Sequence, residues 1–136
     1  MKLFLKHEVR FLVVGGMAVI HYGHPRLTLD LDLWVQPSVE NGERIILALK
    51  DFGFPNPDID PAYFEKANQI LRMGFKPVVI ELFTTIPGVF FGDCYPRQSI
   101  VKWQGMEVPF ISLSDLKANK AASGRHKDLQ DLEELP

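Results

Sequence analysis

Two aspartates at alternate positions of an apolar segment are the most chemically suggestive feature of the sequence. Asp30 and Asp32 stand in the run LDLDLWV. Successive side chains of a β-strand point to opposite faces, so both carboxylates would lie on one face, with Cα atoms about 7 Å apart. Like charges at that spacing repel each other unless a cation neutralises them. The pair therefore predicts a metal site, and its hard oxygen ligands favour Mg²⁺ (or Mn²⁺), with substrate phosphates completing the coordination.

A third acidic residue, Glu81, lies inside another apolar segment, VVIELF over 78–83. If the two strands are neighbours, three carboxylates converge and could hold two metal ions about 4 Å apart, while one carboxylate accepts a proton from an attacking hydroxyl. The alternative is that these acidic residues lie on edge strands and face water. That alternative is weaker for Asp30 and Asp32, because the leucines, tryptophan and valine around them are typical of a central strand.

A pair of glycines, Gly15 and Gly16, follows the apolar run FLVV over 11–14. Between a buried strand and a helix, such a pair allows the backbone to approach a ligand and exposes helix N–H groups to an anion. The alternative is a tight turn without a ligand. The spacing matches neither a Walker A loop nor a G-x-G-x-x-G fingerprint.

The elements that would position these residues follow from hydrophobic periodicity and from helix-capping and turn residues. We predict strands over 11–14, 27–35, 70–73, 78–83, 99–103 and 107–111. We predict helices over 1–9, 17–23, 38–52, 60–67, 114–123 and 126–135, and loops over 55–61 and 84–96. A βαβ-type opening followed by antiparallel hairpins indicates an α/β fold with a central mixed sheet flanked by helices. The length of 136 residues predicts one domain over 1–136.

Composition and charge exclude several classes of protein. The net charge of −2 gives no overall basic field for nucleic-acid binding, so any such contact would need a local patch. A single cysteine, Cys94, excludes an internal disulfide and a cysteine-based zinc site. No apolar run approaches the roughly 18 residues of a membrane span, and the first ten residues carry too many charges for a signal peptide. We expect a cytoplasmic protein without a membrane partner.

Taken together, the motifs resemble the minimal nucleotidyltransferases of the polymerase-beta-like superfamily. Within it they are most similar to the AbiEii-like branch, which is associated with bacterial toxin–antitoxin and phage-defence systems. The likeness extends from residue 10 to about 135. It rests on G-G-x-A over 15–18, H-x-G over 21–23, R-x-T-x-D-x-D over 26–32 and K-x4-R-x-K-D-x2-D over 120–131. The resemblance implies a nucleotidyltransferase-like fold.

The resemblance also implies a role for each matching residue. Asp30 and Asp32 would bind the metal ions, and Glu81 stands where the family usually has a third carboxylate, more often Asp. The residues implied in nucleotide and phosphate binding are Gly15, Gly16, Arg26, Thr28, Lys120 and Arg125. Arg26 and Thr28 would hold phosphate oxygens or brace the carboxylates. The alternative for Lys120 and Arg125 is a solvated helix pair of mixed charge, in which Asp128 pairs with Arg125 or caps the last helix.

The implied reaction is metal-dependent transfer of a nucleoside monophosphate from a nucleoside triphosphate to an acceptor hydroxyl. The acceptor would be RNA, a protein side chain or a small molecule, and its binding would fall to a partner protein, such as a toxin–antitoxin partner, or to a second copy in a homo-oligomer. One alternative is a catalytically inactive nucleotide-binding or toxin–antitoxin interaction module. Another is a metal-dependent phosphohydrolase that uses water as the attacking group.

Overall fold

The computed structural model describes residues 1–25, 27–28, 30–54, 59–74 and 79–136. Within these ranges the helical elements are α1 (Lys2–Lys6), α2 (Gly15–His21), α3 (Val39–Phe52), η1 (Pro61–Glu65), α4 (Phe91–Cys94), η2 (Tyr95–Arg97), α5 (Leu113–Ser123) and α6 (His126–Glu134), where η marks a 3₁₀ helix. The strands are β1 (Phe11–Val14), β2 (Asp30–Val35), β3 (Ile70–Met73), β4 (Val79–Phe83), β5 (Ser99–Trp103) and β6 (Met106–Phe110).

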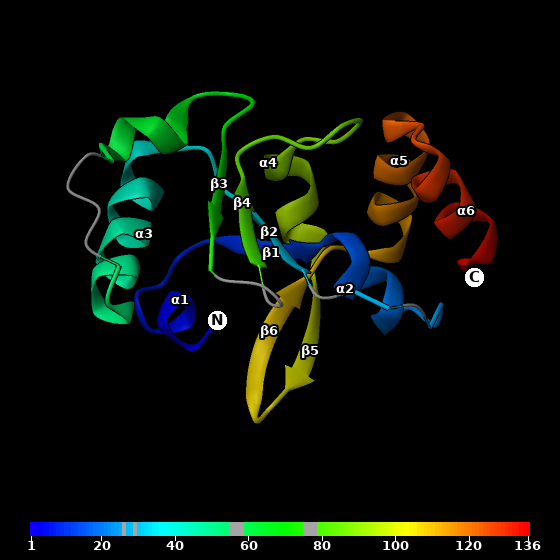
Figure 1. The fold of residues 1–136 in the computed structure, drawn as a ribbon, viewed down its shortest axis with the longest axis horizontal. Helices are drawn as coiled ribbons and strands as arrows, with labels where there is room; N and C mark the ends of the chain where they lie inside the picture. Colours follow the sequence, from blue (N-terminus) through cyan, green and yellow to red (C-terminus); the bar gives the residue numbers. More distant parts are fainter. Residues whose placement is uncertain (26, 29, 55–58, 75–78) are drawn as a thin grey trace.

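In this described part of the chain, the strands form one six-stranded sheet in the order β3-β4-β2-β1-β6-β5. The pairs β1–β2, β3–β4 and β5–β6 are antiparallel, whereas β2–β4 and β1–β6 are parallel. Figure 1 shows α1 and α3 at one side of this sheet, α5 and α6 at the other, and the β5–β6 hairpin projecting from the body. The predicted mixed sheet with flanking helices is confirmed.

The two faces of β2 have different surroundings. Leu31 and Leu33 face α1 and α3, where they line a small apolar cavity with residues of both helices. The opposite face carries Asp30, Asp32 and Trp34, since side chains alternate along the strand. The Trp34 ring packs edge-on against Phe91 of α4, with 5.2 Å between ring centroids. The same strand therefore anchors the core through one face and presents carboxylates on the other.

Helix α3 shows the capping that the sequence predicts. The Ser38 hydroxyl accepts a hydrogen bond from the Asn41 backbone N–H at 3.1 Å, and Gly53 ends the helix in the left-handed conformation. The buried side chain of Asn41 bonds the backbone N–H and carbonyl of Arg10 and the carbonyl of Gln36. Asn41 thus links α3 to the start of β1 and the end of β2.

The structure differs from the predictions in several places. The opening strands β1 and β2, predicted as part of a βαβ-type unit, are antiparallel. Strand β2 begins at Asp30 rather than at residue 27, and α2 begins directly at Gly15 without an intervening turn. The predicted loop over 84–96 contains α4 and the start of η2. Its glycines and prolines are typical of a loop, but Phe91 and Cys94 are buried and so hold a short helix against the sheet. Residues 55–58 and 75–78 of the predicted connections lie outside the described residues.

The C-terminal helices follow the prediction closely. Ser112 caps α5 by accepting a hydrogen bond from the backbone N–H of Asp115. Gly124, with a φ of 65°, separates α5 from α6 in the left-handed conformation that glycine adopts without strain. Over the described residues, no helix combines the length and the apolar character that a bilayer crossing requires.

Candidate active site

The strand register brings the predicted acidic residues to one place. Asp32 lies opposite Val14, the last residue of β1, in the antiparallel pair, and opposite Glu81 of β4 in the parallel pair. Asp32 is therefore flanked by the start of α2 on one side and by a second carboxylate on the other. Strand β2 lies in the interior of the sheet, so Asp30 and Asp32 are not on an edge strand.

Gly15 lies against the Asp32 carboxylate at the point where β1 gives way to α2. A Cβ atom at this position would overlap Asp32 Oδ2, and the φ of 67° also disfavours any other residue. Gly16 is buried in the first turn of α2. Glycine is thus required at residue 15 because the backbone there lies close to the Asp32 carboxylate.

Asp32 is an acid in an unfavourable environment. Its pKa is raised to about 6, first by burial and then by the neighbouring charges of Glu81 and Asp30, while Lys120 and Lys127 oppose the shift. Its Oδ1 atom is buried and has no hydrogen-bond partner among the described residues. A buried carboxylate oxygen without a donor is a position where a bound cation or a substrate proton would lower the free energy.

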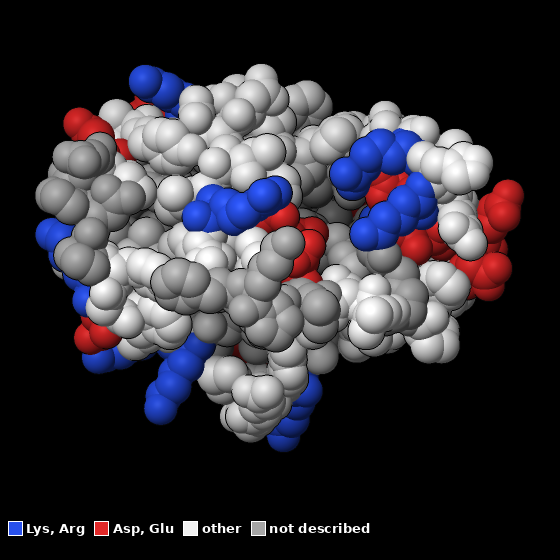
Figure 2. Space-filling view, viewed as in Figure 1, with Lys and Arg blue, Asp and Glu red and all other residues white. Residues whose placement is uncertain are grey.

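A cleft of about 400 Å³ opens beside Asp32. One wall carries Gly15 and Asp32, and the C-terminal helices contribute Asn119, Lys120, Ser123, Arg125 and Asp128. The remaining wall is apolar and comes from β3, β4 and the segment after it, through Ile70, Phe83, Thr85, Ile86 and Pro87. In Figure 2 an acidic patch lies at the centre of this face, between basic surface near β3 and basic surface over α5 and α6.

The ammonium group of Lys120 lies inside an ion-pair network. Only 5% of the side chain is exposed, and Nζ lies 2.9 Å from Asp128 Oδ1 and 3.2 Å from Asp131 Oδ2. Two carboxylates thus compensate its charge, and its first role is to join α5 to α6. Lys120 is therefore neither solvated on the helix surface nor free to project into the cleft as a phosphate ligand.

Arg125 is held in place by the same acidic residue. Its Nε donates to Asp128 Oδ2 at 2.7 Å, as one predicted alternative required, while 76% of its side chain remains exposed. Burial alone would raise the pKa of Asp128, but hydrogen bonds from Arg125, Ser123 and Lys120 bring it below its ordinary value. Arg125 therefore presents an oriented guanidinium at the mouth of the cleft, with donors left over for an anion.

Glu81 has a partner that sequence reasoning missed. Arg72 lies opposite it in the β3–β4 hairpin, and its Nη2 is 3.3 Å from Glu81 Oε2. The register between the two predicted strands could have revealed this pair, since both residues are charged positions in apolar runs. Over the described residues, no group of three or more His, Cys, Asp and Glu side chains is gathered closely enough to hold a metal ion.

Thr28 does not line this cleft. The Thr28 hydroxyl lies 3.4 Å from the backbone nitrogen of Asp30, and both residues line a second cleft. Arg26 lies outside the described residues. His24 has its Nε2 3.9 Å from Asp131 Oδ1.

The donor set at Asp30 and Asp32 suits a divalent ion bound mainly by substrate. Mg²⁺ commonly uses one or two carboxylates and completes its shell with water and phosphate oxygens. The unpartnered Oδ1 of Asp32 is the observation that favours such an ion. One oxygen of Glu81 is already paired with Arg72, so the role of Glu81 as a third metal ligand stays a prediction.

Comparisons with known proteins address the fold. No family model matches the chain, and no curated protein matches it. Among solved structures, the chain is similar to TM1012, a candidate nucleotidyltransferase from Thermotoga maritima, with a TM-score of 0.63 and 15% identity over 98% of this chain and 87% of that one. It is also similar to the lincosamide antibiotic adenylyltransferase LnuA, solved with lincomycin, with a TM-score of 0.55 and 14% identity over 97% of this chain and 89% of that one. At these identities the likeness establishes the fold alone, which is that of the nucleotidyltransferases.

Proposed function

We propose, from the premise of a nucleotidyltransferase fold, that the protein transfers a nucleoside monophosphate from a nucleoside triphosphate to an acceptor hydroxyl. The observation that supports this most directly is the position of Asp32. Its carboxylate lies between the glycine that starts α2 and the Glu81 strand, and it faces a cleft whose opposite wall carries Lys120 and Arg125. A triphosphate needs such a combination of backbone N–H groups, cations and carboxylates.

In the proposed reaction, the triphosphate occupies the cleft beside Asp32. The exposed guanidinium of Arg125 binds its phosphate oxygens, with Lys120 behind it as a fixed positive charge. A divalent ion held by Asp30 and Asp32 would neutralise charge on the phosphates. The acceptor oxygen forms a bond to the α-phosphorus as the bond to the β-phosphate bridging oxygen breaks. Pyrophosphate leaves, and the hydroxyl proton passes to a carboxylate of the site, for which Glu81 is our candidate.

Two further elements of the proposal rest on the sequence motifs. We assign the chain to the AbiEii-like branch, with its toxin–antitoxin association, on the matching residues over 15–32 and 120–131. LnuA is described as an adenylyltransferase that binds a small antibiotic. That precedent supports including small molecules among the acceptors.

Labelled nucleotides test the reaction. The protein is incubated with Mg²⁺ and each α-labelled nucleoside triphosphate, with total RNA, cell protein and a small-molecule extract as acceptors. We expect label transfer that Asp30→Asn or Asp32→Asn reduces about 100-fold or more. Asp93→Asn, an exposed carboxylate on α4, is the matched control and should retain transfer. Absence of both transfer and triphosphate binding with every nucleotide would refute the proposal.

One observation favours a second candidate function, the catalytically inactive nucleotide-binding or interaction module. The carboxylate of Glu81 is paired with Arg72, and so the proton acceptor is engaged. The same experiment separates the two functions. An inactive module binds triphosphate without transferring label to any acceptor, and Arg72→Ala does not restore transfer.

A further inference from the structure

A second cleft lies on the other side of the aspartate pair. Its volume is about 450 Å³, within the range of small-molecule sites. Its walls come from the N-terminal residues, α2, the start of β2 and the tip of the β5–β6 hairpin. Asp30 and Thr28 supply its oxygen atoms near the aspartate pair, and Asp30 shares a strand face with Asp32 of the first cleft. Each cleft therefore reaches one of the two carboxylates, Asp32 in the first and Asp30 in the second.

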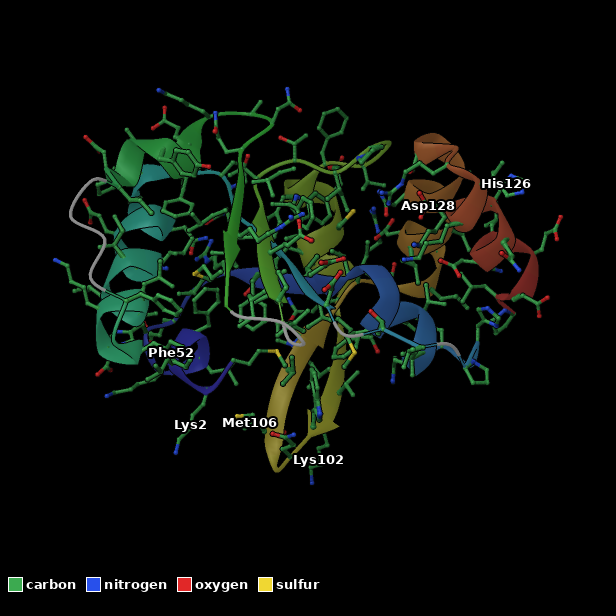
Figure 3. All side chains as sticks on the ribbon, viewed as in Figure 1. Lys2, Phe52, Lys102, Met106, His126 and Asp128 are labelled. Carbon is green, nitrogen blue, oxygen red and sulfur yellow. The ribbon has the colours of Figure 1, made fainter. Side chains whose placement is uncertain are left out.

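The lining of this second cleft is mainly apolar and aromatic. Met17, Leu31, Trp103 and Met106 form most of it. Methionine side chains adapt to ligands of irregular shape, and the half-buried indole of Trp103 offers a flat surface. Figure 3 shows Met106 at the hairpin tip and Lys2 near it, both far from Asp128 of the first cleft.

Charge distinguishes among the classes of acceptor. The cationic groups among the residues that line the second cleft are the Lys2 side chain and the N-terminal ammonium of Met1, and the anion is Asp30. An RNA end would require several cations to neutralise its phosphates, as nucleic-acid sites generally do. A neutral molecule with an apolar body and a hydroxyl group matches both the apolar walls and the oxygen-lined end at Asp30 and Thr28.

We propose that the second cleft is the acceptor site, and that the acceptor is a small molecule with an apolar body whose hydroxyl lies at Asp30. This inference rests on the proposed function, because it assigns the triphosphate to the first cleft. The acceptor hydroxyl oxygen forms the new bond to the α-phosphorus and pyrophosphate leaves, as described above. The hairpin tip selects the acceptor, with Trp103 and Met106 covering its apolar body.

Direct binding tests the site independently of catalysis. The protein is labelled with ¹³C at its methionine methyl groups and titrated with phenylethanol and phenylbutanol, with ethylbenzene as the probe that lacks a hydroxyl. We expect saturable shifts at Met17 and Met106 and quenching of Trp103 fluorescence. The alcohols should bind several-fold more tightly than ethylbenzene. Met73 lines the neighbouring apolar cavity and not the second cleft, so its signal reports whether the probes enter that cavity instead.

Variants locate the binding further. Trp103→Ala should weaken the binding of phenylbutanol by about 10-fold, and Trp103→Phe should restore most of the affinity. Phe90 is a highly exposed aromatic residue outside both clefts, so Phe90→Ala should not change the affinity. Thermal melting checks that each variant folds. If Trp103→Ala does not fold, Met106→Ser serves as the second test. The inference is overturned if the probes leave Met17 and Met106 unshifted up to their solubility limit, or bind with equal affinity to Trp103→Ala.

The failure of this inference is distinguishable from failure of the proposed function. Triphosphate binding is followed separately, through its dependence on Arg125 in the first cleft. Probe binding at Met17 and Met106 supports the second site whether or not label transfer is observed. Label transfer to RNA alone, with no probe bound at the methionines, overturns the small-molecule acceptor while leaving nucleotidyl transfer intact.

Discussion

At the scale of single residues, the burial, charge and contacts of Asp32 point most directly to a bound ligand. Its buried Oδ1 lacks a partner among the residues described, its pKa is raised to about 6, and the backbone at Gly15 approaches its other oxygen closely. A group so placed lowers the stability of the empty protein when it is ionised. Such a cost is typical of binding sites, where the ligand offsets it.

The raised pKa of Asp32 predicts a stability that depends on pH. Between about pH 4 and pH 6 the folded protein retains a proton that the unfolded chain releases, so the free energy of unfolding falls as pH rises through this window. Asp32→Asn removes the ionisable group and therefore removes this loss of stability at higher pH. Allowing for partial exposure, we expect the variant to be about 1–2 kcal/mol more stable than the wild type at pH 8 and equal to it near pH 4.

Urea unfolding at the two pH values measures this difference, with Asp93→Asn as the control. Saturating Mg²⁺ should narrow the gap at pH 8 by stabilising the wild type. An equal stability difference at pH 4 and pH 8 would contradict the assignment of the buried charge to Asp32.

Gly15 provides a second prediction at this scale. Gly15→Ala introduces a Cβ into the Asp32 carboxylate as well as strain at a positive φ. Gly124→Ala is a matched control, because its φ of 65° is close to the 67° of Gly15 and its Cβ would meet no atom within 4 Å. We expect Gly15→Ala to cost about 1–3 kcal/mol more than Gly124→Ala.

A double mutant checks the cause of that additional cost. In an Asp32→Ala background the carboxylate is absent, so most of the difference between Gly15→Ala and Gly124→Ala should disappear in unfolding measurements. If the difference persists unchanged, the close approach between residues 15 and 32 is not its origin.

At the scale of elements, the sequence was most informative where local patterns and burial agree. The apolar run over 11–14, the capped helix from residue 39 to residue 52 and the glycine between α5 and α6 were all predicted, because each carries its own periodicity or capping signal. The short helix α4 was missed because its burial under Trp34 is a tertiary contact that no local pattern encodes.

The same reasoning explains what could be predicted of the candidate site. Charges inside apolar strands identified Asp30, Asp32 and Glu81, and their strands are neighbours as expected. The partners of Glu81 and Lys120 depend on strand register and on the packing of α5 against α6. The Arg72–Glu81 pair follows from the hairpin register and could have been predicted, whereas the contacts of Lys120 depend on the angle between two helices, which a single sequence does not specify.

Lys120 links the two C-terminal helices, so its removal should destabilise the fold. Lys120→Met would leave Asp128 and Asp131 buried without their shared cation, at a cost of about 3–5 kcal/mol in the free energy of unfolding. Lys50→Met, on the exposed face of α3, is the control and should change stability by less than about 0.5 kcal/mol. A small effect of Lys120→Met in chemical denaturation would mean that the network does not stabilise the helix pair.

Replacing Arg125 should affect triphosphate binding more than the stability of the fold, because most of its side chain is exposed. We expect Arg125→Ala to weaken triphosphate binding about 10-fold or more through loss of charge-assisted hydrogen bonds. It should destabilise the fold less than Lys120→Met does, because Asp128 keeps Lys120 and Ser123 as partners. Isothermal titration of a non-hydrolysable triphosphate measures the effect. Unchanged affinity would remove Arg125 from the phosphate site.

At the scale of the whole molecule, the balance of charge argues against a general affinity for nucleic acids. The net charge is −2, and the basic surface in Figure 2 lies in separate groups around a central acidic patch. We expect single-stranded RNA to bind in the millimolar range or more weakly at physiological salt, with a shallow salt dependence in fluorescence anisotropy. Tight binding with a steep salt slope would indicate a basic surface that these groups do not provide.

The attachment of the β5–β6 hairpin has a consequence for how the protein can change over evolutionary time. The hairpin joins the rest of the sheet through β6 beside β1, with Val13 paired to Phe110, whereas the carboxylates lie on β2 and β4. Mutations at the hairpin tip therefore accumulate without disturbing the strands that hold the acidic residues. If the protein has the proposed function, a lineage with this architecture can diversify its acceptor while the residues proposed to bind phosphate stay under a separate constraint.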